Sequence, residues 1–372
     1  MERESASLLL DITEFLIGSW LLTKAVRVLK GTATRRGDKE LSDDRSYLAL
    51  NPIEQTKRTC QDVVSGAKSV FIDVDAIEKV AEELAQTDID NFVNGVRWDE
   101  NDWHYCEDAK IGGPKTCQYI FVLDCLNFCF WQTKDLEYDY LATALKKVYM
   151  NCEKNFDAKN LAEMTEDTLQ SWFPDFKLPL LSERVNRLRE LGNVLSNHYR
   201  GLACNVVFSA NHCAPTLVQI LIEKIPGFRD AYVNPSTGQY IHFYKRAQIL
   251  VGDLWAAYER PSRGHKYYLA NMSDLTTFAD YRVPQILRSM GVLRYAAELA
   301  RDIDNHQMIP CGSIPEIEIR ASTVVAVEML HKVLVSKGHS LLAIELDWLL
   351  WQKGESTKEK MKPHHRTLTI FY

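Results

Sequence analysis

The feature that most constrains the fold of this chain is the recurrence of apolar residues at every third or fourth position. The clearest stripe consists of Leu181, Val185, Leu188, Leu191 and Leu195. This spacing places the apolar side chains on one face of an α-helix. A second stripe ends just before Gly338, a residue type that often terminates helices. The alternation of apolar and polar residues that marks a half-buried strand is rare, so the sequence predicts a mainly α fold with little β structure.

Four further segments have the pattern of helices, and two short segments have that of strands. The expected helices are Asp75–Ala85, Tyr140–Met150, Ala214–Lys224 and Tyr244–Tyr258. Asp75 is the expected N-cap of the first helix, because a short acidic side chain can accept hydrogen bonds from first-turn amides. The expected strands are Tyr119–Leu123 and Thr367–Tyr372.

The 372 residues can bury a full core as one large domain or as two closely associated ones. We expect residues 51–372 to form one domain, with two helical lobes and a soft joint near residues 151–175 as an open alternative. Residues 1–50 are expected to be an N-terminal extension, whose role the sequence does not indicate. Four charged residues interrupt its apolar stretch from Ser7 to Leu29. The stretch is therefore too polar for a transmembrane span, and no membrane partner is expected.

Charge and cysteine content limit the kinds of partner and the cellular compartment that we expect. The formal charge of −6 and the lack of a long Lys/Arg run argue against a surface for duplex nucleic acid. A single nucleotide needs only a local basic cluster and stays open. The nine cysteines are odd in number and include no CxxC pair, which indicates reduced thiols. We expect a cytoplasmic protein, with a nuclear or organellar location still open.

Several common motifs are absent. Gly112-Gly113 lies in a Gly-rich turn that matches neither a P-loop nor a dinucleotide-binding loop. Cys125 and Cys129 are four residues apart, but no second pair follows at a zinc-like spacing. No Gly-x-Ser-x-Gly elbow supports acyl transfer. The sequence thus predicts neither a metal nor a cofactor.

The segment 278–285 is a polar island between two apolar runs. Asp280 precedes a helix whose start is marked by Pro284. An acid at this position tends to stay ionised beside the positive end of the helix dipole. It serves either as an ordinary cap or, with Tyr281 and Arg282, as the wall of a pocket for a polar ligand.

Two more islands place polar groups among apolar ones. Asp124 and Asn127 lie inside the run 122–131, and a buried carboxylate requires hydrogen-bond partners. They form either an internal polar pair of a helix or the edge of an aromatic slot for a planar base. Phe228 and Asp230 lie on a turn beside a helix end, either as ligand contacts or as a core side chain and a solvated acid.

The segment 244–255 has the pattern of an amphipathic helix. Lys245 and Asp253 either surround a phosphate or base, or lie at the surface, which is where we expect Arg246. Near the end of the chain, His365 belongs to a compact basic cluster. The cluster either holds a phosphate or is part of a flexible tail.

Taken together, these islands resemble the queuosine salvage family, the queuosine 5′-phosphate N-glycosylase/hydrolases. The matching stretches are VLDCLNFCFW (122–131), GFRD (227–230), YKRAQILVGDLW (244–255), FADYRVPQ (278–285), EIEIRASTV (316–324) and PHHRT (363–367). Their order and spacing fit the family across roughly residues 55–372. The combination is specific, whereas no single stretch is.

The resemblance implies a helical fold similar to that of the helix-hairpin-helix DNA glycosylases. It also implies a hydrolase that acts on N-glycosyl bonds and needs no metal. The implied substrate is queuosine 5′-monophosphate. The released base, queuine, is a 7-deazaguanine with an aminomethyl-cyclopentenediol arm, and the tRNA-modifying transglycosylase can reuse it. This nucleotide and queuine are the expected partners.

Within the resemblance, Asp280 occupies the position of the glycosylase acid. Cleavage of an N-glycosidic bond gives the ribose oxocarbenium character, which a fixed carboxylate stabilises. The same carboxylate can orient the attacking water and take its proton. A 7-deazapurine lacks a basic N7, so the leaving base cannot be activated by protonation there. The amine of the arm is cationic near neutral pH and requires a carboxylate partner.

The resemblance also suggests which side chains contact the substrate. Asp230 is expected to recognise the base or its amine, and Phe228 to stack on the ring. Lys245 is favoured for the 5′-phosphate, followed by Arg282 and His365. The remaining candidates for substrate contact are His104, Asp124, Asn127, Asp253 and Tyr281.

Two alternatives to this enzyme stay open. A base-excision DNA glycosylase of the same fold type would need a basic groove and a residue that fills the emptied base stack. A non-catalytic queuine-binding or carrier protein would bind the base without turnover.

Overall fold

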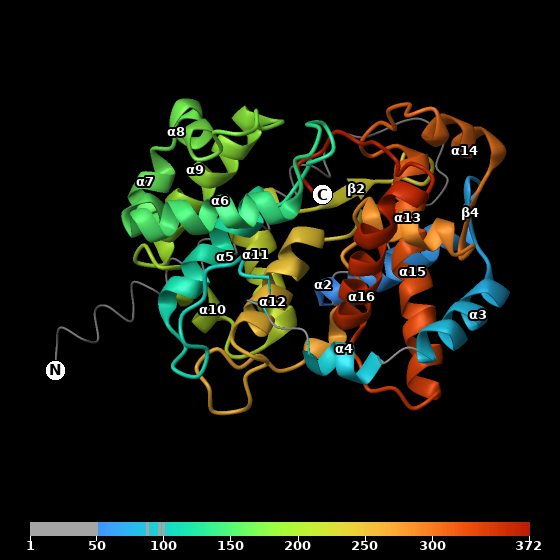
Figure 1. Cartoon of the computed structure of the whole chain (residues 1–372), viewed down its shortest axis with the longest axis horizontal. Coiled ribbons are helices and arrows are strands. Elements are labelled where there is room, and N and C mark those ends of the chain that lie inside the picture. The colour runs from blue at the N-terminus through green and yellow to red at the C-terminus, as the bar shows by residue number, and fades with distance from the viewer. Residues whose placement is uncertain (1–50, 87–88, 96–97, 99–100) are drawn as a thin grey trace, which may run out of the picture. The chain divides into compact units, whose positions relative to one another are not determined.

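The computed structural model describes residues 51–86, 89–95, 98 and 101–372, and helices dominate it (Figure 1). The predicted mainly α fold is confirmed. The predicted N-terminal extension, residues 1–50, lies outside the described residues. No helix within the described part of the chain is long and apolar enough to cross a membrane.

Short 3₁₀ turns and strands separate the helices along the chain. The α helices are α2 (Pro52–Ser65), α3 (Val74–Ala85), α4 (Ile89–Gly95), α5 (Pro114–Leu126), α6 (Tyr138–Asn151), α7 (Ala158–Ala162), α8 (Glu166–Ser171), α9 (Leu181–His198), α10 (Ala203–Ser209), α11 (Ala214–Lys224), α12 (Lys245–Ala257), α13 (Arg282–Ser289), α14 (Ala297–Asp304), α15 (Ile314–Ser336) and α16 (Ala343–Thr357). The 3₁₀ turns are η2 (Glu153–Phe156), η3 (Pro226–Phe228), η4 (Met272–Asp274) and η5 (Lys358–Lys360). The strands are β1 (Val70–Ile72), β2 (Ala231–Val233), β3 (Tyr240–His242) and β4 (Leu293–Tyr295).

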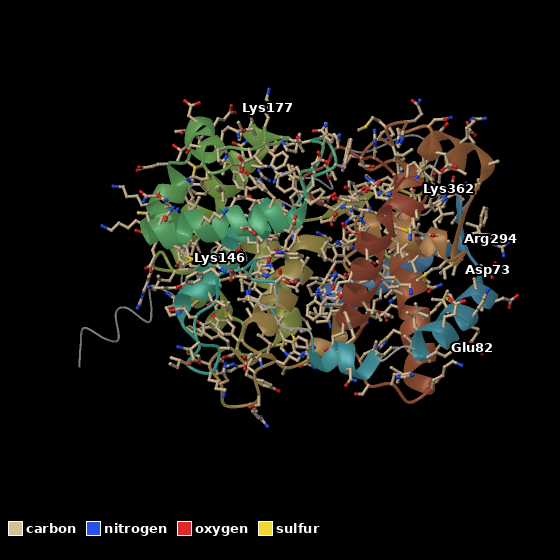
Figure 2. All side chains as sticks on the ribbon, viewed as in Figure 1. Asp73, Glu82, Lys146, Lys177, Arg294 and Lys362 are labelled. Atoms are coloured by element: carbon tan, nitrogen blue, oxygen red, sulfur yellow. The ribbon has the colours of Figure 1, made fainter. Side chains whose placement is uncertain are left out.

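The strands form two separate antiparallel pairs. β1 pairs with β4 in the register Phe71↔Arg294, and β2 pairs with β3 in the register Tyr232↔Ile241. Asp73, which follows β1, forms an ion pair with Arg294 of β4 at the edge of the molecule seen in Figure 2. Each strand is three residues long, so these pairs join loops and do not form a sheet that could organise a core.

Two apolar clusters organise the helices. The first draws its side chains mainly from α5, α6, α9, α11 and α12, and the second from α3, α13, α15 and α16. Figure 1 shows α3, from the early part of the chain, beside the late helix α15, with which it packs. Residues 151–175, where we predicted a soft joint, contribute Phe156, Leu161 and Trp172 to the first cluster. The division into lobes stays a prediction.

The expected helices are confirmed, with shifts at some ends. The expected helix Ala214–Lys224 coincides with α11. Asp73 caps α3 in place of the predicted Asp75, because its carboxylate accepts a hydrogen bond from the Ala76 amide at 3.0 Å. α13 begins at Arg282, two residues before the predicted start at Pro284.

Both expected strands are wrong. Tyr119–Leu123 lies within α5, and its five side chains are all buried. A helix that is buried on every side has no polar face, so its apolar run cannot be distinguished from a buried strand. Thr367–Tyr372 belongs to no strand of the described chain, although the preceding Arg366 forms an isolated bridge with Met308.

Candidate active site

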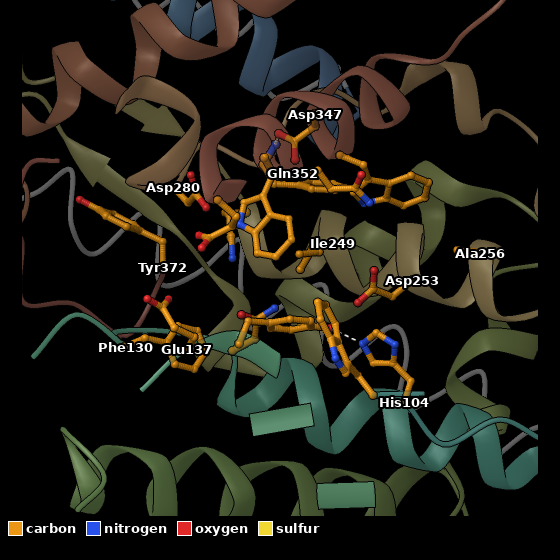
Figure 3. A pocket seen from close by; sticks show the side chains of 18 of the residues that line it. His104, Phe130, Glu137, Ile249, Asp253, Ala256, Asp280, Asp347, Gln352 and Tyr372 are labelled. Atoms are coloured by element: carbon orange, nitrogen blue, oxygen red, sulfur yellow. Dashed lines mark hydrogen bonds between the residues drawn. The ribbon is translucent and has the colours of Figure 1, made fainter. Parts of the chain in front are cut away.

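A cavity with a volume of about 160 Å³ is lined by α12, α16, the loop before α13 and the segment before α5 (Figure 3). Its aromatic lining residues are Trp98, Trp103, Phe130, Tyr138, Phe278, Tyr281, Trp348, Trp351 and Tyr372. An outer hollow of about 610 Å³ shares Trp103, Tyr138 and Trp351 with it. Because aromatic faces stack on planar rings, the inner cavity suits a flat base.

α12 turns one stripe of side chains toward the cavity. Lys245, Ile249 and Asp253 are spaced four residues apart and all line it, as expected for side chains on one helix face. The prediction that Arg246 lies at the surface is wrong, because this side chain is 1% exposed. Its guanidinium donates hydrogen bonds of 3.0 Å to two carbonyls at the end of α5, which fixes α12 against α5.

Asp280 lines the cavity beside Tyr281, the N-cap residue of α13, and its side chain caps the first amides of that helix. Its Oδ1 accepts hydrogen bonds from the amides of Arg282 and Val283, at 2.8 and 3.0 Å. Asp280 therefore serves both as a helix cap and as part of the cavity wall, the two roles that the sequence left as alternatives. Burial raises the pKa of Asp280, and this effect outweighs the Lys245 ammonium and the two amides, which lower it.

Sequence reasoning missed Asp347, which lines the same cavity from α16. Its Oδ1 accepts a hydrogen bond of 2.8 Å from the Phe278 amide and another from the Thr277 hydroxyl. Burial, reinforced by the Asp280 carboxylate, raises the pKa of Asp347 to about 7. The signal was present in the sequence, because Asp347 sits inside a run of large apolar residues just as Asp124 does.

Lys245 stands among these acids. Burial lowers the pKa of its ammonium group, whereas the carboxyl groups of Asp280, Asp124 and Asp347 raise it. Among the described lining residues, it is the one lysine, and no arginine accompanies it. Within the described chain, no group of three or more acid, His or Cys side chains is arranged to hold a metal ion. The charged groups at hand are thus carboxyls and a single ammonium.

A second carboxyl pair lies along the same wall. Asp253 lines the cavity, and Asp124 does not reach its lining. Asn127 lines the cavity and donates a hydrogen bond of 3.2 Å to Asp124 Oδ1. Burial raises the pKa of Asp124 to about 7, and burial together with the Asp124 charge raises the pKa of Asp253 well above its usual range.

His104 is fixed among aromatic rings in the wall. Its Nδ1 lies 2.7 Å from the Trp98 carbonyl oxygen, and its Nε2 lies 3.0 Å from the Tyr138 hydroxyl. Since a carbonyl can only accept, Nδ1 carries the proton and Nε2 faces the hydroxyl. The imidazole also stacks on the Trp98 ring, with 3.9 Å between centroids. Figure 3 places His104 near Asp253, away from Asp280.

Asp230 and Phe228 lie behind the cavity wall and do not line it. Both Asp230 carboxylate oxygens accept hydrogen bonds from Arg320, at 2.8 and 2.6 Å. One of them also accepts the Lys245 amide at 3.1 Å. The Phe228 ring lies against the Arg246 guanidinium, 5.1 Å from its centroid. Because these groups are already engaged inside the protein, we do not retain their predicted direct contacts with the base.

Arg282 and His365 are likewise absent from the lining. The Arg282 guanidinium donates hydrogen bonds of 2.5 Å to Glu355 and to Gln285. His365 Nε2 lies 3.2 Å from the Tyr372 hydroxyl, and burial lowers the pKa of His365 to about 3. This imidazole is therefore neutral near pH 7, and neither residue is retained as a phosphate contact.

Comparison with known proteins places the chain beside one family. A model of the family described as "Queuosine salvage protein" matches residues 103–372. A protein of Dictyostelium discoideum is 42% identical over 87% of this chain and all of its own length. A protein of Sphaerobacter thermophilus is 38% identical over 84% of this chain and 96% of its own. A protein of Bos taurus is 30% identical over 87% of this chain and 99% of its own length. All three are named queuosine 5′-phosphate N-glycosylase/hydrolase.

Proposed function

This chain belongs to the queuosine salvage protein family, and on that premise we propose that it hydrolyses the N-glycosidic bond of queuosine 5′-monophosphate to release queuine. The proposal rests above all on one observation. Asp280, a carboxylate fixed by two backbone amides, faces a cavity walled by aromatic rings. A glycosylase needs these two parts, a slot for the base and an acid beside the ribose.

The reaction consumes one water and yields queuine and ribose 5-phosphate. In the proposed arrangement the base lies between the aromatic walls, with the ribose at Asp280. As the C1′–N9 bond breaks, the Asp280 carboxylate stabilises the developing positive charge on the ribose. It also takes a proton from the attacking water, and that proton is then available to N9 of the departing base.

Lys245 and Asp347 assist at the same end of the cavity. The Lys245 ammonium lowers the pKa of Asp280 and so favours its ionised form. It is also the cation available to the 5′-phosphate. Asp347, with a pKa near 7, can offer a protonated or an ionised carboxyl oxygen to a ribose hydroxyl. We place this activity in the cytoplasm, where released queuine can be reused for tRNA modification.

The test is to incubate the purified chain with queuosine 5′-monophosphate and to follow free queuine and ribose 5-phosphate by mass spectrometry. We expect equal amounts of both products, formed over many turnovers. Binding of queuine without turnover would instead identify a carrier protein. Release of a base from duplex DNA, without action on the nucleotide, would identify a DNA glycosylase.

We predict that turnover declines on the acidic side with a midpoint above the usual aspartate pKa of about 3.9. The reason is that burial raises the pKa of Asp280, so its catalytic carboxylate is lost as pH falls through this raised value. Lys245 opposes the shift, so Lys245→Met is expected to move the acidic limb of its residual activity to higher pH. The measurement is kcat against pH for both proteins. An acidic limb that moves to lower pH in the variant would contradict the assignment.

A further inference from the structure

Asp253 lies at the end of the cavity opposite to the proposed ribose site. Lys245 and Asp253 both line it and lie eight residues apart on α12. At about 1.5 Å per residue, roughly 12 Å of helix separate them. Figure 3 shows Asp280 toward one side of the cavity, and Asp253 with His104 toward the other. A substrate whose ribose lies at Asp280 therefore extends its far end toward Asp253.

Asp253 lacks the partners that a buried carboxyl normally has. It is 5% exposed, and its Oδ2 is buried without a hydrogen-bond partner among the described residues. Asp124, fully buried, has an Oδ2 in the same condition. Two buried acids that each have one carboxyl oxygen without a hydrogen-bond donor are costly to the protein. The Lys245 ammonium acts on both acids but lies eight residues from Asp253 along α12, so a cation delivered directly to Asp253 would further reduce the cost.

We propose that Asp253, backed by Asp124, binds the cationic secondary amine on the arm of the 7-deazaguanine base and thereby determines which nucleotides are hydrolysed. The inference rests on the proposed function, since it takes its substrate from there. It replaces Asp230, whose carboxylate is occupied by Arg320. The ammonium group donates a hydrogen bond to Asp253 Oδ2, and Asp124 behind it adds negative charge.

This arrangement discriminates against nucleotides whose base has no cationic arm. A guanosine or 7-deazaguanosine 5′-monophosphate has a similar base but no cationic arm. When such a nucleotide fills the slot, it excludes water and provides no ammonium group for Asp253 Oδ2. Sites built around a polar partner reject analogues that lack it, because their own buried groups then stay unpaired. The aromatic walls cannot provide this discrimination, since they stack equally well on all of these bases.

The decisive experiment compares two substrates in wild type and Asp253→Asn, which keeps the size of the side chain and removes its charge. The substrates are queuosine 5′-monophosphate and 7-deazaguanosine 5′-monophosphate. We expect the ratio of their kcat/KM values to fall by about 10- to 100-fold in the variant, the range for loss of a charged hydrogen bond. Asp124→Asn is expected to lower the ratio in the same direction. The charge-matched control is Asp75→Asn, at an exposed position on α3.

A second measurement separates this inference from the proposed function. Calorimetry gives the affinities of queuine and 7-deazaguanine, which need no catalysis. If wild type fails to hydrolyse either nucleotide, the proposed function falls, and the ratio of these affinities still tests Asp253. A ratio that drops at least 10-fold in Asp253→Asn and stays constant in Asp75→Asn supports the inference. A ratio unchanged in Asp253→Asn, whether both affinities fall together or neither falls, overturns it.

Discussion

Replacement of Asp280 by Asn is expected to lower kcat by about 10³-fold or more while the protein stays folded. The amide oxygen of Asn can still accept hydrogen bonds from the Arg282 and Val283 amides, which Asp280 Oδ1 receives at 2.8 and 3.0 Å. Asn is as good a helix cap as Asp. What disappears is the negative charge that stabilises the ribose cation and the group that takes the proton from water. The substitution should therefore lower kcat.

The matched control for this variant is Asp73→Asn. Asp73 also caps a helix, accepting the Ala76 amide at 3.0 Å at the start of α3, and does not line the cavity. Turnover is measured as the rate of queuine release, folding by thermal unfolding, and ligand binding by titration with queuine. If Asp280→Asn binds queuine and keeps kcat within about tenfold of wild type, Asp280 is not the catalytic acid. In that case the hydrolase remains, and its mechanism must be assigned to another carboxyl such as Asp347.

The helices could be predicted wherever one face was polar. The stripe that begins at Leu181 follows α9, which has buried residues on one side and exposed ones on the other. α5 could not be predicted in the same way, because the core surrounds it and leaves its sequence without a period. The Asp75 cap was misplaced because more than one acid near a helix start can accept an amide, and only the backbone geometry selects Asp73.

The site was partly predictable for a related reason. The pattern of segments 244–255 and 278–285, together with the resemblance, led to Lys245, Asp253 and Asp280. The rule that a polar residue inside an apolar run must have a partner led to Asp124 and Asn127. It cannot say whether that partner is a ligand or a distant part of the chain. Asp230 carried the same signal, yet its partner is Arg320, 90 residues away in sequence. Partners at that separation are set by packing, which a single sequence does not display.

The second large effect concerns this buried pair: Arg320→Met is expected to lower the free energy of unfolding by about 3–5 kcal/mol. Arg320 is fully buried and donates hydrogen bonds to both Asp230 oxygens. Its Nε donates to the Ala279 carbonyl at 3.0 Å, and its guanidinium lies 4.0 Å from the Phe243 ring centroid. Met fills similar space but leaves the Asp230 carboxylate buried without a counter-charge. Urea unfolding measures the loss.

Asp230→Asn combined with Arg320→Met should recover part of that stability, because the unpaired charge of Asp230 is then removed. The recovery stays partial, because the buried Glu316 carboxylate, 3.7 Å from the Arg320 guanidinium, still lacks its counter-charge. Lys362→Met is the control. It breaks a 3.1 Å pair between Asp304 and Lys362, whose ammonium lies at the surface in Figure 2. The change should alter stability little, because solvent screens such pairs. A single Arg320→Met variant as stable as this control would contradict the prediction.

Turnover should not recover with stability in the double variant. Asp230 holds the Lys245 amide at the start of α12, and Arg320 holds the carbonyl of the residue before Asp280. The pair therefore connects the two elements that carry the ammonium and the catalytic carboxylate. Removing both charges relieves part of the energetic penalty but leaves these elements without their common anchor, so kcat should stay low while queuine still binds. Parallel recovery of stability and kcat would show that the anchor serves the fold alone.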